Sequence, residues 1–138
     1  MELERRKTRN FLKEMKQLIF VFIGGGLGSI LRYLTVKYLN NYSATIPFGT
    51  FIANILGSLG IGIVLGMAIK NNSLNHHQTL FLATGFCGGF TTFSSFAYEN
   101  HIFLKNGDLV LLALYTIASL IVAFLAVFVG VYLIKILV

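Results

Sequence analysis

The sequence is poor in cysteine, proline and acidic residues. Its 138 residues include one Cys, one Pro, no Trp and five Asp or Glu. The single cysteine, Cys87, cannot form an internal disulfide and excludes a cysteine-rich metal site. Charged residues make up 12% of the chain, about half the share in soluble domains. Together with 56% hydrophobic residues and a mean hydropathy of +0.78, this excludes a disordered chain or a water-soluble globule and predicts an integral membrane protein.

The few charges are unevenly placed. Eleven Lys and Arg against five Asp and Glu give a net charge of +6. Residues 1–16 hold six of the cations, namely Arg5, Arg6, Lys7, Arg9, Lys13 and Lys16. This terminal cluster beside an apolar stretch does not indicate a nucleic-acid partner. We predict that residues 1–16 form a basic cytoplasmic tail next to anionic lipid and that residues 17–138 form one transmembrane domain.

Four apolar segments reach the length of about 20 residues that crosses a bilayer as a helix. They are residues 18–39, 48–69, 78–98 and 109–134, and they predict an all-α fold of four transmembrane helices. The connections are expected at residues 40–47, 70–77 and 99–108, which contain turn-forming or helix-breaking residues. Four spans place both termini on the same side, and the excess of cations there predicts that both are cytoplasmic in a multi-pass protein of the cell membrane.

The polar residues inside the predicted spans indicate what could be transported. None of the predicted spans contains Asp or Glu, which argues against an exporter built on an intramembrane carboxylate and against an acidic cation pathway. The spans instead hold hydrogen-bond donors, a composition that favours an anion or a neutral solute. These donors are Arg32, Asn54, Thr91, Thr92, Ser94, Ser95, Tyr115, Thr116 and Ser119.

The third span has an unusual centre. Gly88-Gly89 precedes Thr91-Thr92, and both pairs are weak helix formers, so we expect a broken helix near Gly88-Gly89. A break within the membrane frees backbone carbonyls, which in other membrane proteins line cavities and coordinate Na⁺. After the break, Phe93 and Phe96 are three residues apart and share a helix face, as do Thr92 and Ser95. The positive edges of the aromatic rings could contact a small anion.

Three motifs in these spans resemble the CrcB/Fluc family of fluoride channels. They are Gly85–Phe96 in the third span, Gly28-x-x-x-Arg32-Tyr33 in the first, and Pro47-x-Gly49-Thr50-x-x-x-Asn54-x-x-Gly57-Ser58 in the second. The resemblance covers roughly residues 17–135. It implies an antiparallel dimer with two narrow fluoride pores and one central, structural Na⁺ that is not transported.

The resemblance also implies roles for individual residues. Gly88 and Thr91 would supply backbone carbonyls to the Na⁺, and Arg32 would lie near the aqueous vestibule. The fluoride pore would be lined by Asn54, Phe93, Phe96, Thr92, Ser95, Tyr115 and Ser119. One polar position of the family falls on Ala123, which has no hydroxyl.

The residues themselves leave alternatives open. Asn54 could simply make an interhelical hydrogen bond, and Arg32 could be an anchor at the membrane surface. The leading hypothesis is a passive fluoride channel, not an enzyme, that lowers cytoplasmic fluoride. The alternatives are a small exporter of organic cations and a non-transporting membrane assembly subunit. Because the basic tail favours one orientation, the dimer could pair two copies of this chain or this chain with an oppositely oriented paralogue.

Overall fold

The computed structural model describes residues 1–40, 46–71 and 74–137. Within these ranges the chain forms helices and their connections, with no strand. Four helical stretches are long and apolar enough to cross a bilayer. The predicted all-α, four-span fold is confirmed, and the protein is a multi-pass membrane protein.

Four helical stretches follow one another along the chain. Helix α1 (Glu2–Leu39) includes the basic tail as an unbroken continuation of the first span, and α2 (Phe48–Asn71) is the second span. The third stretch is built in pieces, from α3 (His76–Thr79) through the π-helical segment η1 (Leu80–Cys87) to α4 (Gly88–Phe90), and resumes as α5 (Phe93–Asn106). Helix α6 (Leu109–Leu137) is the fourth span.

The predicted break in the third span is present, but it lies just beyond the glycine pair. Gly88 and Gly89 are helical, whereas Thr91 (φ −79°, ψ 156°) and Thr92 (φ −150°, ψ 118°) are extended. Gly89 is needed for close packing instead, because a Cβ there would be 3.0 Å from the Cα of Gly25 in α1, whereas Gly88 is exposed and a Cβ there would come no closer than 3.8 Å to the Ala83 carbonyl oxygen. The extended residues are β-branched, a class that favours this backbone conformation.

The predicted loop at residues 99–108 is wrong. Helix α5 continues to Asn106 and only Gly107 and Asp108 separate it from α6. Gly107 has φ +80°, and the amides of Gly107 and Asp108 donate to the carbonyls of Leu104 (3.1 Å) and Phe103 (2.9 Å). This is a Schellman cap, which places the end of the helix at the glycine and not at the end of the apolar run.

Glycines also bring the helices into backbone contact. Gly24 and Gly28 of α1 are buried, and a Cβ on Gly28 would be 2.8 Å from the amide nitrogen of Phe90. A second seam joins α2 to α6, where a Cβ on Gly130 would be 2.8 Å from the amide nitrogen of Ile63. These small residues therefore pack helices within one chain, as such residues do in membranes.

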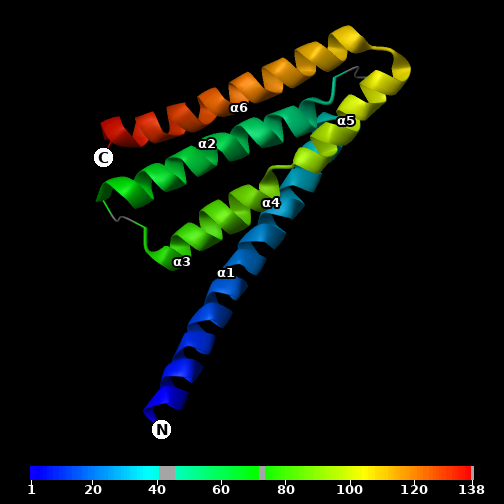
Figure 1. The fold of residues 1–138 in the computed structure, drawn as a ribbon. Coiled ribbons are helices and arrows are strands. Elements are labelled where there is room, and N and C mark those ends of the chain that lie inside the picture. Colours follow the sequence, from blue (N-terminus) through cyan, green and yellow to red (C-terminus); the bar gives the residue numbers. More distant parts are fainter. Residues whose placement is uncertain (41–45, 72–73, 138) are drawn as a thin grey trace.

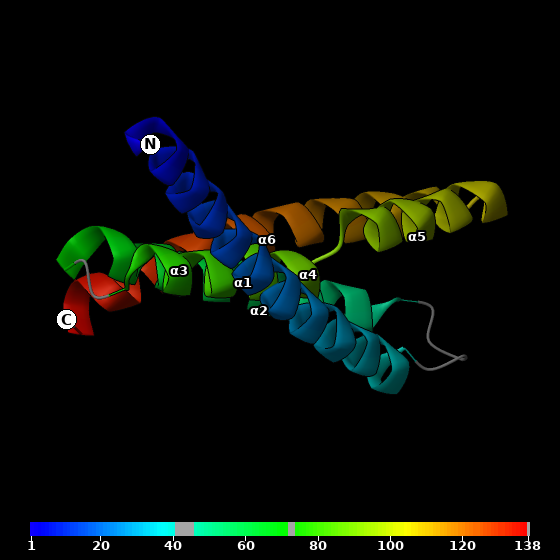
Figure 2. The same ribbon diagram turned by 90° about the horizontal axis from the view of Figure 1, so that it is seen from below.

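The helices are not all aligned. In Figure 1, α2 and α6 lie side by side, and the rod from α3 to α4 runs along α2. Helix α1 crosses this group obliquely, which the rotated view in Figure 2 also shows. Both termini lie at the same end of the group (Figure 1), as four spans require.

Candidate functional site

The broken third helix is held open by one side chain from α2. Asn54 Oδ1 accepts a hydrogen bond from the amide of Thr92 (2.7 Å), and Asn54 Nδ2 donates to the carbonyl of Thr92 (3.1 Å). The Asn54 side chain thus satisfies both backbone groups of an extended residue that has no helical partners. The alternative expected from the sequence, a hydrogen bond from Asn54 to another helical stretch, is therefore present. It consists of two bonds, which clamp the extended residue at both of its backbone groups.

The break also removes the helical hydrogen-bond donors of the carbonyls at the end of α4, those of Gly88 and Thr91 among them. In a continuous helix the amide of Thr92 would donate to the carbonyl of Gly88, and the amide of Ser95 to that of Thr91. The Thr92 amide donates to Asn54 instead, and the Ser95 amide donates to Thr92 Oγ1 (3.2 Å). Gly88 is exposed and Thr91 is half-buried.

Oxygen ligands of this kind suit Na⁺, which broken helices coordinate through their carbonyls. The Gly88 and Thr91 carbonyls named from the sequence therefore fit the implied ion. Among the residues that the structure describes, no group of three His, Cys, Asp or Glu side chains could hold a metal.

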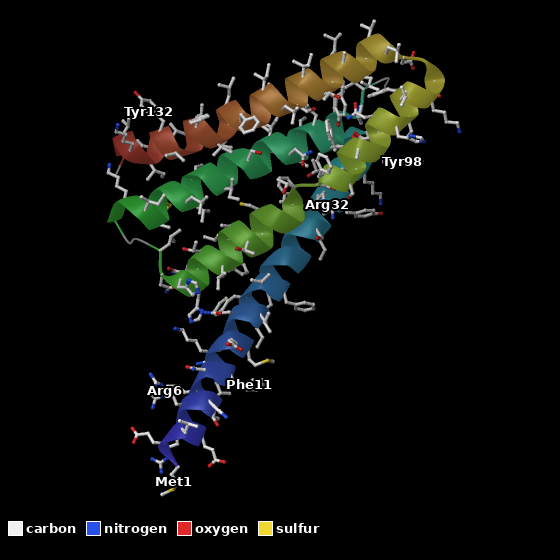
Figure 3. The ribbon with its side chains drawn as sticks, in the orientation of Figure 1. Met1, Arg6, Phe11, Arg32, Tyr98 and Tyr132 are labelled. Carbon is white, nitrogen blue, oxygen red and sulfur yellow. The ribbon has the colours of Figure 1, made fainter. Side chains whose placement is uncertain are left out.

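Arg32 contacts the end of α4. Its Nε donates to the carbonyl of Gly89 (3.1 Å), which lies within 3.4 Å of Ser29 Oγ as well. A guanidinium suits this place, because the free carbonyls at a helix C-terminus carry partial negative charge. Figure 3 shows Arg32 where α1 passes this junction. The half-buried arginine therefore caps the broken helix, a contact that neither the predicted vestibule role nor a membrane anchor includes.

The two phenylalanines after the break lie together but differ in exposure. Their ring centroids are 5.8 Å apart with the planes at 46°, which confirms the predicted shared face. Phe96 is 8% exposed and packs on the ring of Tyr115 at 5.4 Å, whereas Phe93 is 77% exposed. One ring therefore belongs to the core, and the other projects from this single chain.

A groove of about 300 Å³ lies at the break. It combines residues from α2, the third stretch and α6, so that sequence-distant positions meet. Six of the predicted residues line it: Asn54, Thr91, Thr92, Phe93, Phe96 and Ser119. Ser95 is not among its lining residues but is linked to it through Thr92, whose Oγ1 lies 3.2 Å from Ser95 Oγ.

Among the residues that helix α6 contributes to the groove, Ser119 has a hydroxyl and Ala123 has none. Ser119 Oγ is buried and has no hydrogen-bond partner within the described part of the chain. One turn further on, Ala123 also lines the groove, so the position where this sequence departs from the family motif presents a methyl group. The groove can thus offer a solute a hydroxyl at one level of α6 and only apolar contact at the next.

Glu99 is the main residue that the sequence reasoning missed. Placed in a loop, it instead lies half-buried in α5. Its two carboxylate oxygens accept hydrogen bonds from Thr50 Oγ1 (2.5 Å) and the Tyr115 hydroxyl (2.7 Å). The third helical stretch therefore carries a carboxylate one residue past the predicted end of the span at residue 98. The available signal was spacing, because Glu99 follows Phe96 by three residues and so shares its face.

Tyr115, which the sequence reasoning also assigned to the pore, lies outside the groove in this single chain. Its hydroxyl is directed to the carboxylate of Glu99. Its ring packs against Phe96 and, edge-on, against Phe103 at 5.7 Å. The residue supports the groove from behind, through Phe96.

A family model described as CrcB-like protein, Camphor Resistance (CrcB), matches residues 19–131. The chain belongs to the CrcB family. The sequence resemblance is thereby confirmed. Among relatives in the CrcB family, the fluoride-specific ion channel FluC of Gloeothece citriformis is 51% identical over 122 residues, which cover 88% of this chain and 98% of the relative.

Two further relatives extend the comparison. The fluoride-specific ion channel FluC of Flavobacterium psychrophilum is 40% identical over 122 residues, with the same coverage of both chains. That of Bacteroides fragilis is 43% identical over 123 residues, covering 86% of this chain and 96% of the relative. The CrcB match thus includes most of the first and fourth spans, all of the second and third, and the break, and it begins after the basic tail.

Proposed function

We propose that this chain is a passive, fluoride-selective ion channel that lowers the cytoplasmic fluoride concentration and so protects the cell from toxicity. The observation that carries the proposal is the groove at the broken helix. Aromatic rings, an amide and hydroxyls line it, and none of its lining residues is charged. Membership of the CrcB family and three relatives named as fluoride channels support it.

The lining suits the chemistry of fluoride. The ion is small and strongly hydrated, so a pore must replace its water with hydrogen-bond donors. Asn54 Nδ2 has a second hydrogen beyond the one donated to Thr92, and Ser119 Oγ has no partner in the described part of the chain. The edges of Phe93 and Phe96 add weak positive potential. Several modest contacts of this kind allow release, which a buried cation would hinder.

Passive export follows from acid–base chemistry and the membrane potential. Hydrogen fluoride is a weak acid that crosses a bilayer in its neutral form and ionises in the cytoplasm. A channel that passes only the anion then lets the inside-negative potential drive fluoride out. The proposed activity is transport of an ion, with no chemical step.

The working unit is proposed to be an antiparallel dimer around a structural Na⁺. Two observations support a second subunit: Phe93 is 77% exposed although it lines the groove, and Gly88, one of the two residues assigned to the Na⁺, is exposed in the single chain. One chain contributes only the carbonyls of Gly88 and Thr91, whereas a second subunit would double the number of oxygen ligands. The partner is a second copy of this chain or an oppositely oriented paralogue.

The proposed location is the cell membrane, with both termini in the cytoplasm. On the side of the membrane that holds both termini, Lys70 and Lys135 add to the cations of the tail. On the opposite side, Lys37 lies in the last turn of α1 and Lys105 in the last turn of α5. This distribution follows the positive-inside pattern.

No specific observation favours either of the two alternative functions, an exporter of organic cations or a non-transporting assembly subunit. Export of organic cations would use a membrane-embedded carboxylate, but both oxygens of Glu99 are engaged by Thr50 and Tyr115. An assembly subunit would not need a groove with an unpartnered hydroxyl. Family membership, not the absence of a carboxylate, is what favours fluoride over cations.

Fluoride efflux from liposomes tests the proposed function. Purified protein reconstituted with Na⁺ present should release fluoride and retain chloride. Liposomes that retain fluoride, both with this chain alone and with a co-expressed paralogue, would contradict the proposal. In cells, loss of the gene should cause sensitivity to fluoride specifically, which loss of an assembly subunit would not.

Replacing all Na⁺ by a large organic cation tests the ion separately. If the carbonyls of Gly88 and Thr91 hold a structural Na⁺, the dimer should dissociate and fluoride efflux should fall. Efflux that needs no Na⁺ would contradict the metal site while leaving the fluoride proposal standing.

A further inference from the structure

The first sixteen residues of α1 are separate from the helical body. Every residue from 1 to 16 is exposed, and Gln17 is the first that is half-buried. At that point Gln17 Nε2 lies 3.1 Å from His76 Nε2 in α3, which joins α1 to the body. The preceding residues project beyond the other helices (Figure 1) and lie outside the family match at 19–131.

The length of α1 places these residues outside the hydrocarbon. Its 38 residues form a rod of roughly 57 Å at 1.5 Å per residue. The hydrocarbon core takes about 20 residues of such a rod, and the apolar stretch that supplies them starts at Leu18. The segment before it therefore begins in the headgroup region and continues beyond it.

The cations of this segment form a stripe. Arg5, Arg9, Lys13 and Lys16 follow one another at intervals of four, four and three residues, which keeps them on one face of a helix. Arg6 is three residues from Arg9 and widens the same face. We call these five residues the basic stripe.

One acidic residue of the segment, Glu2 at its outer end, falls on the same face, where five cations outweigh it. At 100° per residue, Glu4 and Glu14 fall on the other half of the helix, and so does the sixth cation, Lys7. Figure 3 shows Arg6 and Phe11 projecting to opposite sides of the segment. The positive potential is therefore concentrated along one side.

The stripe begins where the membrane surface lies. Lys16 lies two residues before the apolar stretch begins at Leu18. Lys13 is only about one turn, roughly 5 Å, further out, within the Debye length of about 8 Å at physiological salt. Because α1 crosses the other helices obliquely (Figures 1 and 2), the segment leans over the surface and does not stand upright on it. The long Lys and Arg side chains extend this reach.

We propose that the basic stripe binds the phosphate-bearing headgroups of anionic lipids in the leaflet on the terminal side. The charge complementarity and the position of Lys16 at the boundary select a lipid over a soluble polyanion, because a stripe for a soluble partner has no reason to start at the surface. Anchored in this way, the segment fixes the tilt of α1 relative to the bilayer.

Hydrogen exchange on the full-length chain in lipid nanodiscs tests this inference. The amides of residues 2–16 should exchange more slowly in discs that contain phosphatidylglycerol than in discs of phosphatidylcholine alone. Each cation in contact should change the bound population by roughly fivefold, and high salt should abolish the difference. The amides of α6 serve as an internal reference that should not respond.

A matched pair of variants separates the stripe from net charge. Arg9→Gln removes one positive charge from the stripe, and Lys7→Gln removes one from outside it. Arg9→Gln should reduce the slowing of exchange by phosphatidylglycerol, and Lys7→Gln should largely preserve it. The triple change Arg5→Gln, Arg9→Gln and Lys13→Gln should abolish the effect. Since all these side chains are exposed, the variants should keep the fold, which size-exclusion chromatography checks.

Three outcomes would overturn the inference. They are equal exchange in both kinds of disc, equal effects of Arg9→Gln and Lys7→Gln, and slowed exchange in neutral discs on adding inorganic phosphate or RNA. The last outcome would assign the stripe to a soluble anion instead of the membrane.

Discussion

At the scale of single residues, the exposed ring of Phe93 is the simplest probe of the groove. It is 77% exposed in one chain and lines the groove, while Phe128 in α6 is 70% exposed and is not among the groove's lining residues. Phe93→Ile removes an aromatic edge worth about 1 kcal/mol, so fluoride efflux from liposomes should fall by roughly fivefold. Phe128→Ile is the matched control and should leave efflux unchanged. Equal effects of the two changes would contradict a pore role for Phe93.

Asn54 makes a second residue-scale prediction. Asn54→Ala removes two hydrogen bonds to Thr92, each worth about 1 kcal/mol, and leaves the backbone of a buried residue unsatisfied. We expect the free energy of unfolding in detergent to fall by about 2–4 kcal/mol, together with a loss of efflux. Asn10→Ala, in the exposed tail, controls for the loss of an amide. A variant with full stability and reduced efflux would show that Asn54 acts on the ion and not as a clamp.

At the scale of helices, Gly107 shows how a single residue ends an element. Gly107 has φ +80°, and no atom lies within 4 Å of the position that a Cβ would occupy, so an alanine there would meet conformational strain but no clash. Gly107→Ala should lower the unfolding free energy by about 1 kcal/mol. Gly26→Ala is the control, because Gly26 is helical and equally unobstructed, and it should be neutral or stabilising. Thermal unfolding of both variants measures the difference, and equal shifts would refute the role of the left-handed cap.

The sequence predicted the four spanning helices correctly but placed the end of the third one too early, because spans and helix ends depend on different interactions. The spans depend on long apolar runs, which hydropathy reports directly. The end of α5 depends on a backbone cap at Gly107, eight residues beyond Glu99, so the polar residue appeared to mark the end of the span. The carboxylate is tolerated there because Thr50 and Tyr115, from two other helices, supply its hydrogen bonds. No pattern local to α5 contains that information.

The candidate site shows the same division. The motif identified the break, and spacing identified the shared face of Phe93 and Phe96, since both are local properties of one helix. The clamp by Asn54 and the cap by Arg32 join residues that are 38 and 57 positions apart in sequence. The residue types indicated hydrogen-bond donors, but only the packing of α1 and α2 against the break shows what they bind.

At the scale of the whole molecule, the basic tail affects how the chain enters the membrane. Six cations precede the first span, and cations close to a span are retained in the cytoplasm. An antiparallel dimer of identical chains needs insertion in both orientations. The tail therefore favours a single orientation, whereas the proposed dimer of identical chains needs both orientations.

Reporter proteins fused to the C-terminus resolve this conflict. Because four spans place both termini on one side, a reporter active in the cytoplasm should give the whole signal, and one active outside should give none. Replacing the six tail cations by Gln leaves Lys70 and Lys135 against Lys37 and Lys105, a balance that should produce both signals. Replacing Thr8 and Asn10 by Ala is the control and should change nothing. Single orientation in the native chain would make an oppositely oriented paralogue necessary for an antiparallel dimer, whereas balanced signals would mean that two copies of this chain suffice.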